Sequence, residues 1–176
     1  CGIEAFSEDE VICGLRFIKE DGVELPSKIA LFQGLPKADK MELIVQKAVE
    51  LGVGEIIPVA AGRSIVKLDE KKAKAKVSRW QGIAEAAAKQ SRRGIIPKIS
   101  EVMSMKEAIA YAGSMDVRLI PYELAEDMAK TKEIISGIRP GESVAVFIGP
   151  EGGFEEKEIA AAMERGFLPV TLGRRI

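Results

Sequence analysis

A glycine-rich stretch, Gly149-Pro150-Glu151-Gly152-Gly153, has residue types and a spacing that could do chemistry. It follows an unbroken apolar run, residues 144–148, and leads into residues 155–165, which are typical of a helix with an acidic first turn. Glycines let a backbone approach a ligand closely and present its N–H donors. In open α/β sheets, ligands bind beyond the carboxyl ends of the strands. The stretch therefore indicates a ligand site; a plain connection between strand and helix is the alternative interpretation.

The absence of phosphate-binding motifs from this turn limits the class of ligand that it could bind. The turn matches neither of the phosphate-binding fingerprints G-x-G-x-x-G and G-x-x-x-x-G-K-[ST]. The carboxylate of Glu151 suits a cationic or hydroxyl-rich ligand better than a phosphate.

The chain of 176 residues contains no histidine. Ser-His-Asp chemistry, Cys-His chemistry and histidine-ligated metals are therefore excluded from it. Its two cysteines, Cys1 and Cys13, have no metal-binding spacing and form no disulfide framework, which predicts a reducing, cytoplasmic location and no metal. Catalysis would depend on carboxylates, Arg, Lys, Tyr, backbone donors or a cofactor.

Composition predicts an ordinary globular chain, with 47% apolar and 30% charged residues, that holds one domain or one domain plus a fragment of another. No apolar run of about 18 residues is present, so we expect no membrane-spanning segment. The chain opens on Cys1 instead of Met, which we interpret as a truncated start.

Positive charge is concentrated between Arg63 and Lys98. This segment holds eleven Lys and Arg against three acidic residues, a charge of +8 in a chain whose net charge is −1. Such a block is a candidate phosphate-facing surface. A solvated helix face is the alternative for residues 71–76. That alternative fits Arg92 and Arg93 less well, because they sit at a predicted helix end beside Gly94.

The elements that must position these residues follow an α/β pattern from Lys28 onward. Strands are predicted at residues 29–32, 55–60, 95–99, 117–121, 144–148 and 168–173, and helices at residues 39–51, 71–91, 106–112, 128–136 and 155–165. Asp39 and Glu42 have capping-box spacing, and Trp80 falls on a buried helical stripe. Before Lys28, residues 11–18 are strand-like, and Asp21-Gly22 is a turn signal that closes a hairpin with them or with a missing partner.

Strands separated by helices predict a parallel, doubly wound sheet with helices on both faces. Three of its strands end in turn-like residues that could line one pocket, at residues 121–123, 149–153 and 172–174.

An ordered set of motifs runs from about residue 37 to the last residue. It comprises residues 46–53, 63–68, 86–91, 148–154 and 172–176, with Arg79, Trp80, Arg93, Pro97, Glu158, Ile159, Gly166 and Phe167. This set resembles the SPOUT methyltransferases, and among them the RsmE family, the ribosomal RNA small-subunit methyltransferase E enzymes.

The resemblance implies a SPOUT-type parallel sheet with a deep trefoil knot in its C-terminal half. Residues 1–25 would be the remnant of a β-rich, PUA-like RNA-binding domain, and residues 26–176 the SPOUT methyltransferase domain. It also implies a homodimer with its sites at the interface. The implied activity is methylation of N3 of one uridine in the decoding region of 16S rRNA with S-adenosylmethionine, on free 16S rRNA or on the 30S subunit.

The resemblance also implies roles for particular residues. The cofactor loops would comprise Leu119, Pro121, Glu123, Ile148, Gly149, Glu151, Gly152, Gly153, Leu172, Gly173 and Ile176. Glu151 would bond the ribose or offset the sulfonium charge, and the residues leave that choice open. Contacts to rRNA would come from Arg63, Lys67, Arg79, Arg92 and Arg93.

Sulfonium methyl transfer needs neither a metal nor a covalent nucleophile, so a chain without histidine can perform it. The N3 proton of uridine must leave before or during transfer, and an arginine would stabilise the resulting anion. Within this chain Arg93 is the first candidate for this catalytic role, with a phosphate contact or a helix-end charge as the alternative interpretation, and Arg63 is a further candidate.

The chain departs from the family pattern in two places. Ala61-Gly62 stands where the family usually has Ser-Glu, and the family's Leu-Arg-Thr-Glu-Thr-Ala segment, which supplies a candidate catalytic arginine, would follow Ile176. Two other functions stay open: a Rossmann-like nucleotide-binding enzyme, and a non-enzymatic RNA-binding module that uses residues 63–98.

Overall fold

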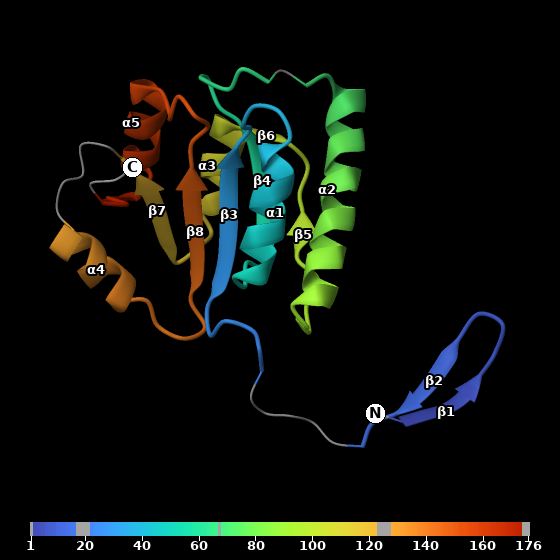
Figure 1. Ribbon diagram of the computed structural model, residues 1–176. Coiled ribbons are helices and arrows are strands. Elements are labelled where there is room, and N and C mark those ends of the chain that lie inside the picture. Colours follow the sequence, from blue (N-terminus) through green and yellow to red (C-terminus); the bar gives the residue numbers. More distant parts are fainter. Residues whose placement is uncertain (1, 17–21, 67, 123–127, 174–176) are drawn as a thin grey trace.

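A computed structural model describes residues 2–16, 22–66, 68–122 and 128–173 (Figure 1). The predicted site residues Lys67, Glu123 and Ile176 lie outside the described residues, as does Asp21 of the predicted turn. Near the N-terminus, β1 (Gly2–Phe6) and β2 (Val11–Gly14) pair as an antiparallel hairpin. The partner of the predicted strand is thus β1, which precedes it in the chain.

The remaining described strands form one sheet. They are β3 (Lys28–Gly34), β4 (Glu55–Ala60), β5 (Lys98–Ile99), β6 (Met103–Ser104), β7 (Val117–Pro121), β8 (Ser143–Ile148) and β9 (Leu168–Val170). Over the described ranges their order is β5-β4-β3-β8-β7-β9, with β6 paired to β4, and every pair is parallel. The predicted parallel sheet is therefore confirmed.

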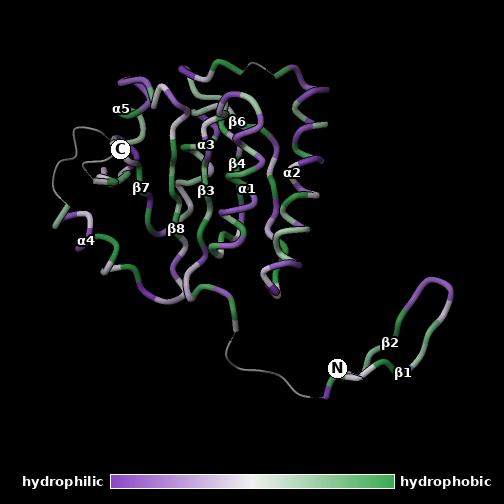
Figure 2. The backbone as a smooth tube through the Cα atoms, viewed as in Figure 1, coloured by the Kyte–Doolittle hydropathy of each residue, from purple (hydrophilic) through white to green (hydrophobic). Residues whose placement is uncertain are grey.

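Helices cover both faces of this sheet. They are α1 (Lys40–Glu50), α2 (Glu70–Gln90), α3 (Met105–Ala112), α4 (Met128–Ser136) and α5 (Glu156–Glu164). Side chains alternate along a strand, so Ile57 packs with α3 and α5 while its neighbour Ile56 packs with α1 and α2. Figure 2 shows β3 and β8 hydrophobic along most of their length, as expected for strands covered on both sides.

Stacked aromatic rings join the two central strands. Phe32 of β3 lies parallel to Phe147 of β8, with 4.3 Å between ring centroids, and Phe167 meets Phe147 edge-on at 4.9 Å. The register pairs Gln33 with Ile148, so the carboxyl ends of β3 and β8 lie side by side. The glycine-rich turn that follows β8 therefore begins next to the end of β3.

Three local predictions can be judged against this fold. Trp80 is only 2% exposed, which confirms it as a core residue. The capping box at Asp39 is wrong, because Asp39 makes no side-chain cap and the carboxylate of Glu42 accepts from Arg79 of α2 instead. The last strand ends at Val170, three residues earlier than predicted, which leaves residues 171–173 outside the strand.

Candidate functional site

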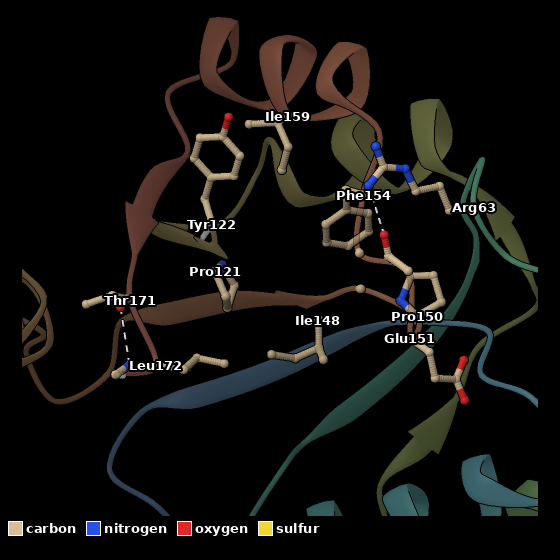
Figure 3. Close-up of a pocket in the computed structure, with 14 residues that line it drawn as sticks. Arg63, Pro121, Tyr122, Ile148, Pro150, Glu151, Phe154, Ile159, Thr171 and Leu172 are labelled. Atoms are coloured by element: carbon tan, nitrogen blue, oxygen red, sulfur yellow. Dashed lines mark hydrogen bonds between the residues drawn. The ribbon is translucent and has the colours of Figure 1, made fainter. Parts of the chain in front are cut away.

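A cavity of about 460 Å³ lies at the carboxyl ends of β7, β8 and β9. Three segments line it: Pro121 and Tyr122 after β7, residues 148–154 at the end of β8, and residues 171–173 after β9 (Figure 3). Arg63, from the loop after β4, and Ile159 of α5 complete the lining. The structure thus brings together three chain segments that the sequence analysis predicted to share one pocket.

Most of the predicted cofactor residues line this cavity, namely Pro121, Ile148, Gly149, Glu151, Gly152, Gly153, Leu172 and Gly173. Leu119 does not, because its side chain is 6% exposed and packs in the core with Val144 and Val170. Tyr122, Pro150, Phe154, Ile159 and Thr171 also line the cavity, although none of them was named among the predicted cofactor residues. Four of these five lie within or next to the predicted segments, and Ile159 reaches the cavity because α5 starts there.

The glycine-rich turn is packed closely against the end of β3. A Cβ atom on Gly34 would lie 2.7 Å from the backbone nitrogen of Pro150, which leaves no room for a side chain. The backbone N–H of Gly153 donates to the carbonyl of Pro150 at 2.8 Å, and Gly153 has a φ of +67° that favours glycine. A Cβ on Gly153 would meet no atom within 4 Å, so the missing side chain leaves open space beside the turn.

The loop that carries Arg63 is attached to the same turn. The Arg63 Nη1 donates to the carbonyl oxygen of Gly152 at 2.9 Å. One residue earlier, the N–H of Gly62 donates to Glu158 Oε1 at 2.8 Å, and the other oxygen of Glu158 accepts from the N–H of Glu155 at 2.8 Å. Glu158 is buried in the first turn of α5, where the helix dipole favours a carboxylate. It therefore holds the Arg63 loop against the start of α5.

Glu151 does not direct its charge into the cavity. Its carboxylate accepts from Lys40 Nζ at 2.8 Å and from the backbone N–H of Lys37 at 3.2 Å. Hydrogen bonding from Lys40 lowers the pKa of Glu151 from about 4.5 to about 2. In Figure 3 the carboxylate points away from Ile148 and Leu172. Neither expected role, at the ribose or at the sulfonium, matches these partners: Glu151 ties the turn to residues 37–40.

The third wall of the cavity is held by α4. The Thr171 N–H donates to Oγ1 of Thr131 at 3.0 Å, and Oγ1 of Thr171 accepts from the Gly173 N–H at 3.2 Å. Thr131 is 6% exposed, so this contact is sheltered from water. Gly173 has a φ of +98°, and a Cβ there would lie 3.3 Å from Cε of Met128. The sequence offered no signal for Thr131, since its partner lies 40 residues away.

Arg93 lies away from the cavity. Its side chain is 4% exposed, pairs with Glu24, and donates to the carbonyl oxygens of Val49 and Val53. These surroundings do not support Arg93 as the catalytic arginine or as an RNA contact, because its donors are used inside the chain. Of the other predicted RNA contacts, Arg79 is exposed and paired with Glu42, and Arg92 is exposed at the end of α2.

Comparison with known proteins assigns this architecture to a family. Residues 23–176 match the model of the RNA methyltransferase domain family. The chain belongs to this family. It is 37% identical over 179 residues to the ribosomal RNA small subunit methyltransferase E of Bacillus subtilis, covering all of this chain and 70% of that protein. It is 36% identical to the protein of the same name from Mesomycoplasma hyopneumoniae, covering 87% of this chain and 64% of the relative.

These matches place the chain among the methyltransferase E proteins. It spans from 49% to 71% of the length of the curated relatives. Among solved structures, it superposes on the Neisseria gonorrhoeae methyltransferase E bound to S-adenosyl methionine with a TM-score of 0.78 and 36% identity, covering 90% of this chain and 63% of that one. A putative methyltransferase of Legionella pneumophila in complex with the same cofactor gives a TM-score of 0.79 at 32% identity, covering 99% and 69%.

The described residues hold neither a membrane-spanning helix nor a cluster of metal ligands. None of the helices within them is long and apolar enough to cross a membrane. No group of three or more His, Cys, Asp or Glu side chains in the same residues is arranged to hold a metal ion.

Proposed function

We propose that this chain is the catalytic part of an S-adenosylmethionine-dependent methyltransferase that methylates N3 of a uridine in the decoding region of 16S rRNA. The observation that carries the proposal is the cavity built by three converging loops in a chain of the methyltransferase E family. A cytoplasmic location, with 16S rRNA or the 30S subunit as partner, belongs to the same proposal.

The lining of the cavity fits the cofactor. Its volume of about 460 Å³ is in the usual range for small-molecule sites, about 300–1,000 Å³. Pro121, Ile148 and Leu172 offer apolar surfaces for the adenine ring, and the glycine-rich turn exposes backbone donors and acceptors. When bound, S-adenosylmethionine supplies a methyl group on a sulfonium that is already an activated leaving group. The protein therefore has to bind and orient the cofactor and the RNA base and to exclude water from them. It needs no nucleophile of its own.

Arg63 is the residue that we assign to the uridine. Its contact with Gly152 uses one of the five donors of a guanidinium and fixes the side chain at the cavity wall. A fixed cation beside the reacting base would stabilise the negative charge that develops when N3 loses its proton. Arg63 thus takes the role for which Arg93 was the first candidate.

The proposal includes an RNA surface outside the cavity. Arg79, Arg92 and the outward-facing lysines of α2 would contact phosphates, and Lys67, outside the described residues, would add to them. The β1–β2 hairpin, with the rest of residues 1–25, would belong to a PUA-like RNA-binding domain, and residues 26–176 would form the SPOUT domain.

A trefoil knot and a homodimer complete the proposal. In support of the knot, the chain returns after α5 to pair β9 with β7, and residues 171–173 then lie against α4, which follows β7. In support of the homodimer, the large apolar side chain of Leu172, which lines the cavity, is half-exposed, and Met163 of α5 and Leu168 of β9 are exposed as well. A second copy of the chain would cover such a surface.

Two measurements on the full-length protein test the function. Calorimetry with S-adenosylmethionine is expected to give saturable binding, and no heat at millimolar ligand would remove the proposal. Mass spectrometry of 16S rRNA from cells that lack the gene is then expected to show one new methyl group, on uridine N3, after incubation with protein and cofactor. RNA binding without methylation would instead favour the RNA-binding module suggested by the basic block.

A further inference from the structure

The segment just before β3, residues 22–27, is called the linker here. It is bonded along the amino-terminal end of the sheet, opposite the cavity. The carbonyl of Pro26 accepts from the Gly141 N–H at 2.7 Å, and the N–H of Lys28 donates to the carbonyl of Glu142 at 3.0 Å. Leu25 packs on Gly52 after α1, so closely that a Cβ on Gly52 would lie 2.7 Å from the Leu25 Cγ. In Figure 1 this segment runs directly into the start of β3.

The tightest attachment in this segment is made by Glu24. Its carboxylate pairs with the guanidinium of Arg93 and also accepts from the backbone N–H groups of Gly94 at 3.0 Å and Ile95 at 3.2 Å. Hydrogen bonding from Arg93 is the largest cause of a lowered pKa at Glu24, so the carboxylate is ionised at neutral pH. One carboxylate thus joins the linker to residues about 70 positions away.

Arg93 supplies the other half of the attachment from inside the fold. Its side chain is 4% exposed, and its Nη1 reaches the carbonyl oxygens of Val49 and Val53 at the C-terminal end of α1, where the helix dipole is negative. Without Glu24, Arg93 would keep these two acceptors. The position of Arg93 in the α/β unit therefore does not depend on Glu24. The position of the linker does depend on Glu24.

This ion pair, with Arg93 buried and Glu24 partly exposed, is weak support for stability alone, because the cost of removing charge from water offsets much of the attraction. What such a pair does fix is geometry, and a bidentate arginine fixes it more narrowly than an apolar contact would. Leu25 on Gly52 would be enough to hold the linker on the surface. The charged pair adds a defined direction for the chain where it leaves the α/β unit.

We propose that Glu24 and Arg93 form a latch that fixes the direction of the N-terminal segment, so that RNA held by that segment is delivered to the cavity. Glu24 is then a positioning residue that contacts neither cofactor nor RNA. The inference rests on the proposed function, since it assumes that the N-terminal segment binds the RNA substrate. A fixed linker raises the effective concentration of the bound RNA at the cavity, and a loose one lowers it.

The test uses Glu24→Ala and Glu24→Gln in the full-length protein, with Glu50→Ala as the matched control. Glu50 is also ion-paired, but its side-chain partners Lys47 and Gln46 belong to its own helix, α1. We expect Glu24→Ala to raise KM for 16S rRNA about tenfold, with unchanged kcat and cofactor affinity. Glu24→Gln, which keeps the shape and the acceptor oxygen, should give a smaller rise, and Glu50→Ala none.

Limited proteolysis supplies the second readout. Cleavage within residues 15–25 should be faster in Glu24→Ala than in wild type, while α1 and α2 stay protected at the same rate. If the wild type methylates rRNA, an unchanged KM in Glu24→Ala would overturn the latch. Linker cleavage at the wild-type rate in Glu24→Ala would overturn it as well. A wild-type protein that does not methylate rRNA would instead overturn the proposed function, and the cleavage rates would still decide whether the latch exists.

Discussion

The guanidinium of Arg63, in the loop after β4, donates a hydrogen bond of 2.9 Å to the carbonyl oxygen of Gly152, in the turn after β8. The two residues are 89 positions apart, and both line the cavity. The contact sets the position of the one arginine that the described residues place at this cavity wall, and it keeps the turn and the loop at a fixed separation.

Replacing Arg63 should therefore affect methyl transfer more than cofactor binding. We expect Arg63→Ala to lower the single-turnover rate by about 10²–10³, as for loss of one preorganised donor to a developing anion. Arg63→Lys should recover little, because an ammonium lacks the planar fork. In the control Arg79→Ala, RNA binding should weaken and should depend less steeply on salt concentration. The methylation rate at saturating RNA should stay unchanged. An Arg63→Ala enzyme at the wild-type rate would show that Arg63 is not used.

The close packing of Gly34 against Pro150 predicts a penalty for the smallest side chain. Gly34→Ala should lower the free energy of unfolding by about 1–3 kcal/mol, because the Cβ would displace the turn backbone, and should weaken cofactor binding as well. Gly82→Ala is the control: a Cβ there meets nothing within 4 Å, and the helix α2 should gain about 0.5–1 kcal/mol. Denaturant titration measures both changes. Equal effects of the two substitutions would contradict this assignment.

Thr131 should matter for the cofactor although it does not line the cavity. In Thr131→Val the Thr171 N–H loses its acceptor, which costs about 1–3 kcal/mol for a sheltered donor. Residues 171–173 should then move, and calorimetry should show cofactor affinity reduced by about tenfold or more. Thr131→Ser keeps the hydroxyl and should bind like wild type. If both variants bind equally, the wall does not depend on this hydroxyl.

The pairing of Glu151 with Lys40 predicts a pH dependence with a definite sign. The pKa of Glu151 falls from about 4.5 to about 2 on folding, so its contribution to stability is fully present above pH 4.5 and is lost as the pH falls toward 2. Glu151→Gln should therefore lower Tm at pH 7 and lower it less at pH 3. Salt screens exposed pairs, so the effect should also shrink at high ionic strength. A Tm difference that is constant from pH 7 to pH 3 would rule out this pairing in solution.

Much of the architecture could be predicted because it depends on patterns of neighbouring residues in the sequence. The strand at residues 144–148 and the helices around Val45 and Trp80 follow from hydrophobic periodicity, and the structure confirms them. The turn after β8 follows from its glycines. The convergence of three loops on one cavity follows from a general property of parallel sheets, whose carboxyl ends meet at one edge.

The partners of charged side chains could not be predicted in this way. Glu42 has the spacing of a capping residue, yet its carboxylate accepts from Arg79, 37 positions later. Arg93 belongs to a family motif, but its side chain is buried and pairs with Glu24, 69 positions earlier. Glu151 lies in the turn predicted to bind the ligand and points instead to Lys40. Spacing along the chain carries no information about such contacts, which depend on how the elements pack.

The strand order has a consequence for when the enzyme becomes active. β8 inserts between β3 and β7, and the cavity walls come from Arg63 and from segments that extend to Gly173. Pairings this distant in sequence give a high contact order and slow folding. During synthesis, the cavity cannot close until nearly all of this chain has left the ribosome exit tunnel. A nascent copy would therefore hold no complete cavity while its own translation is still under way.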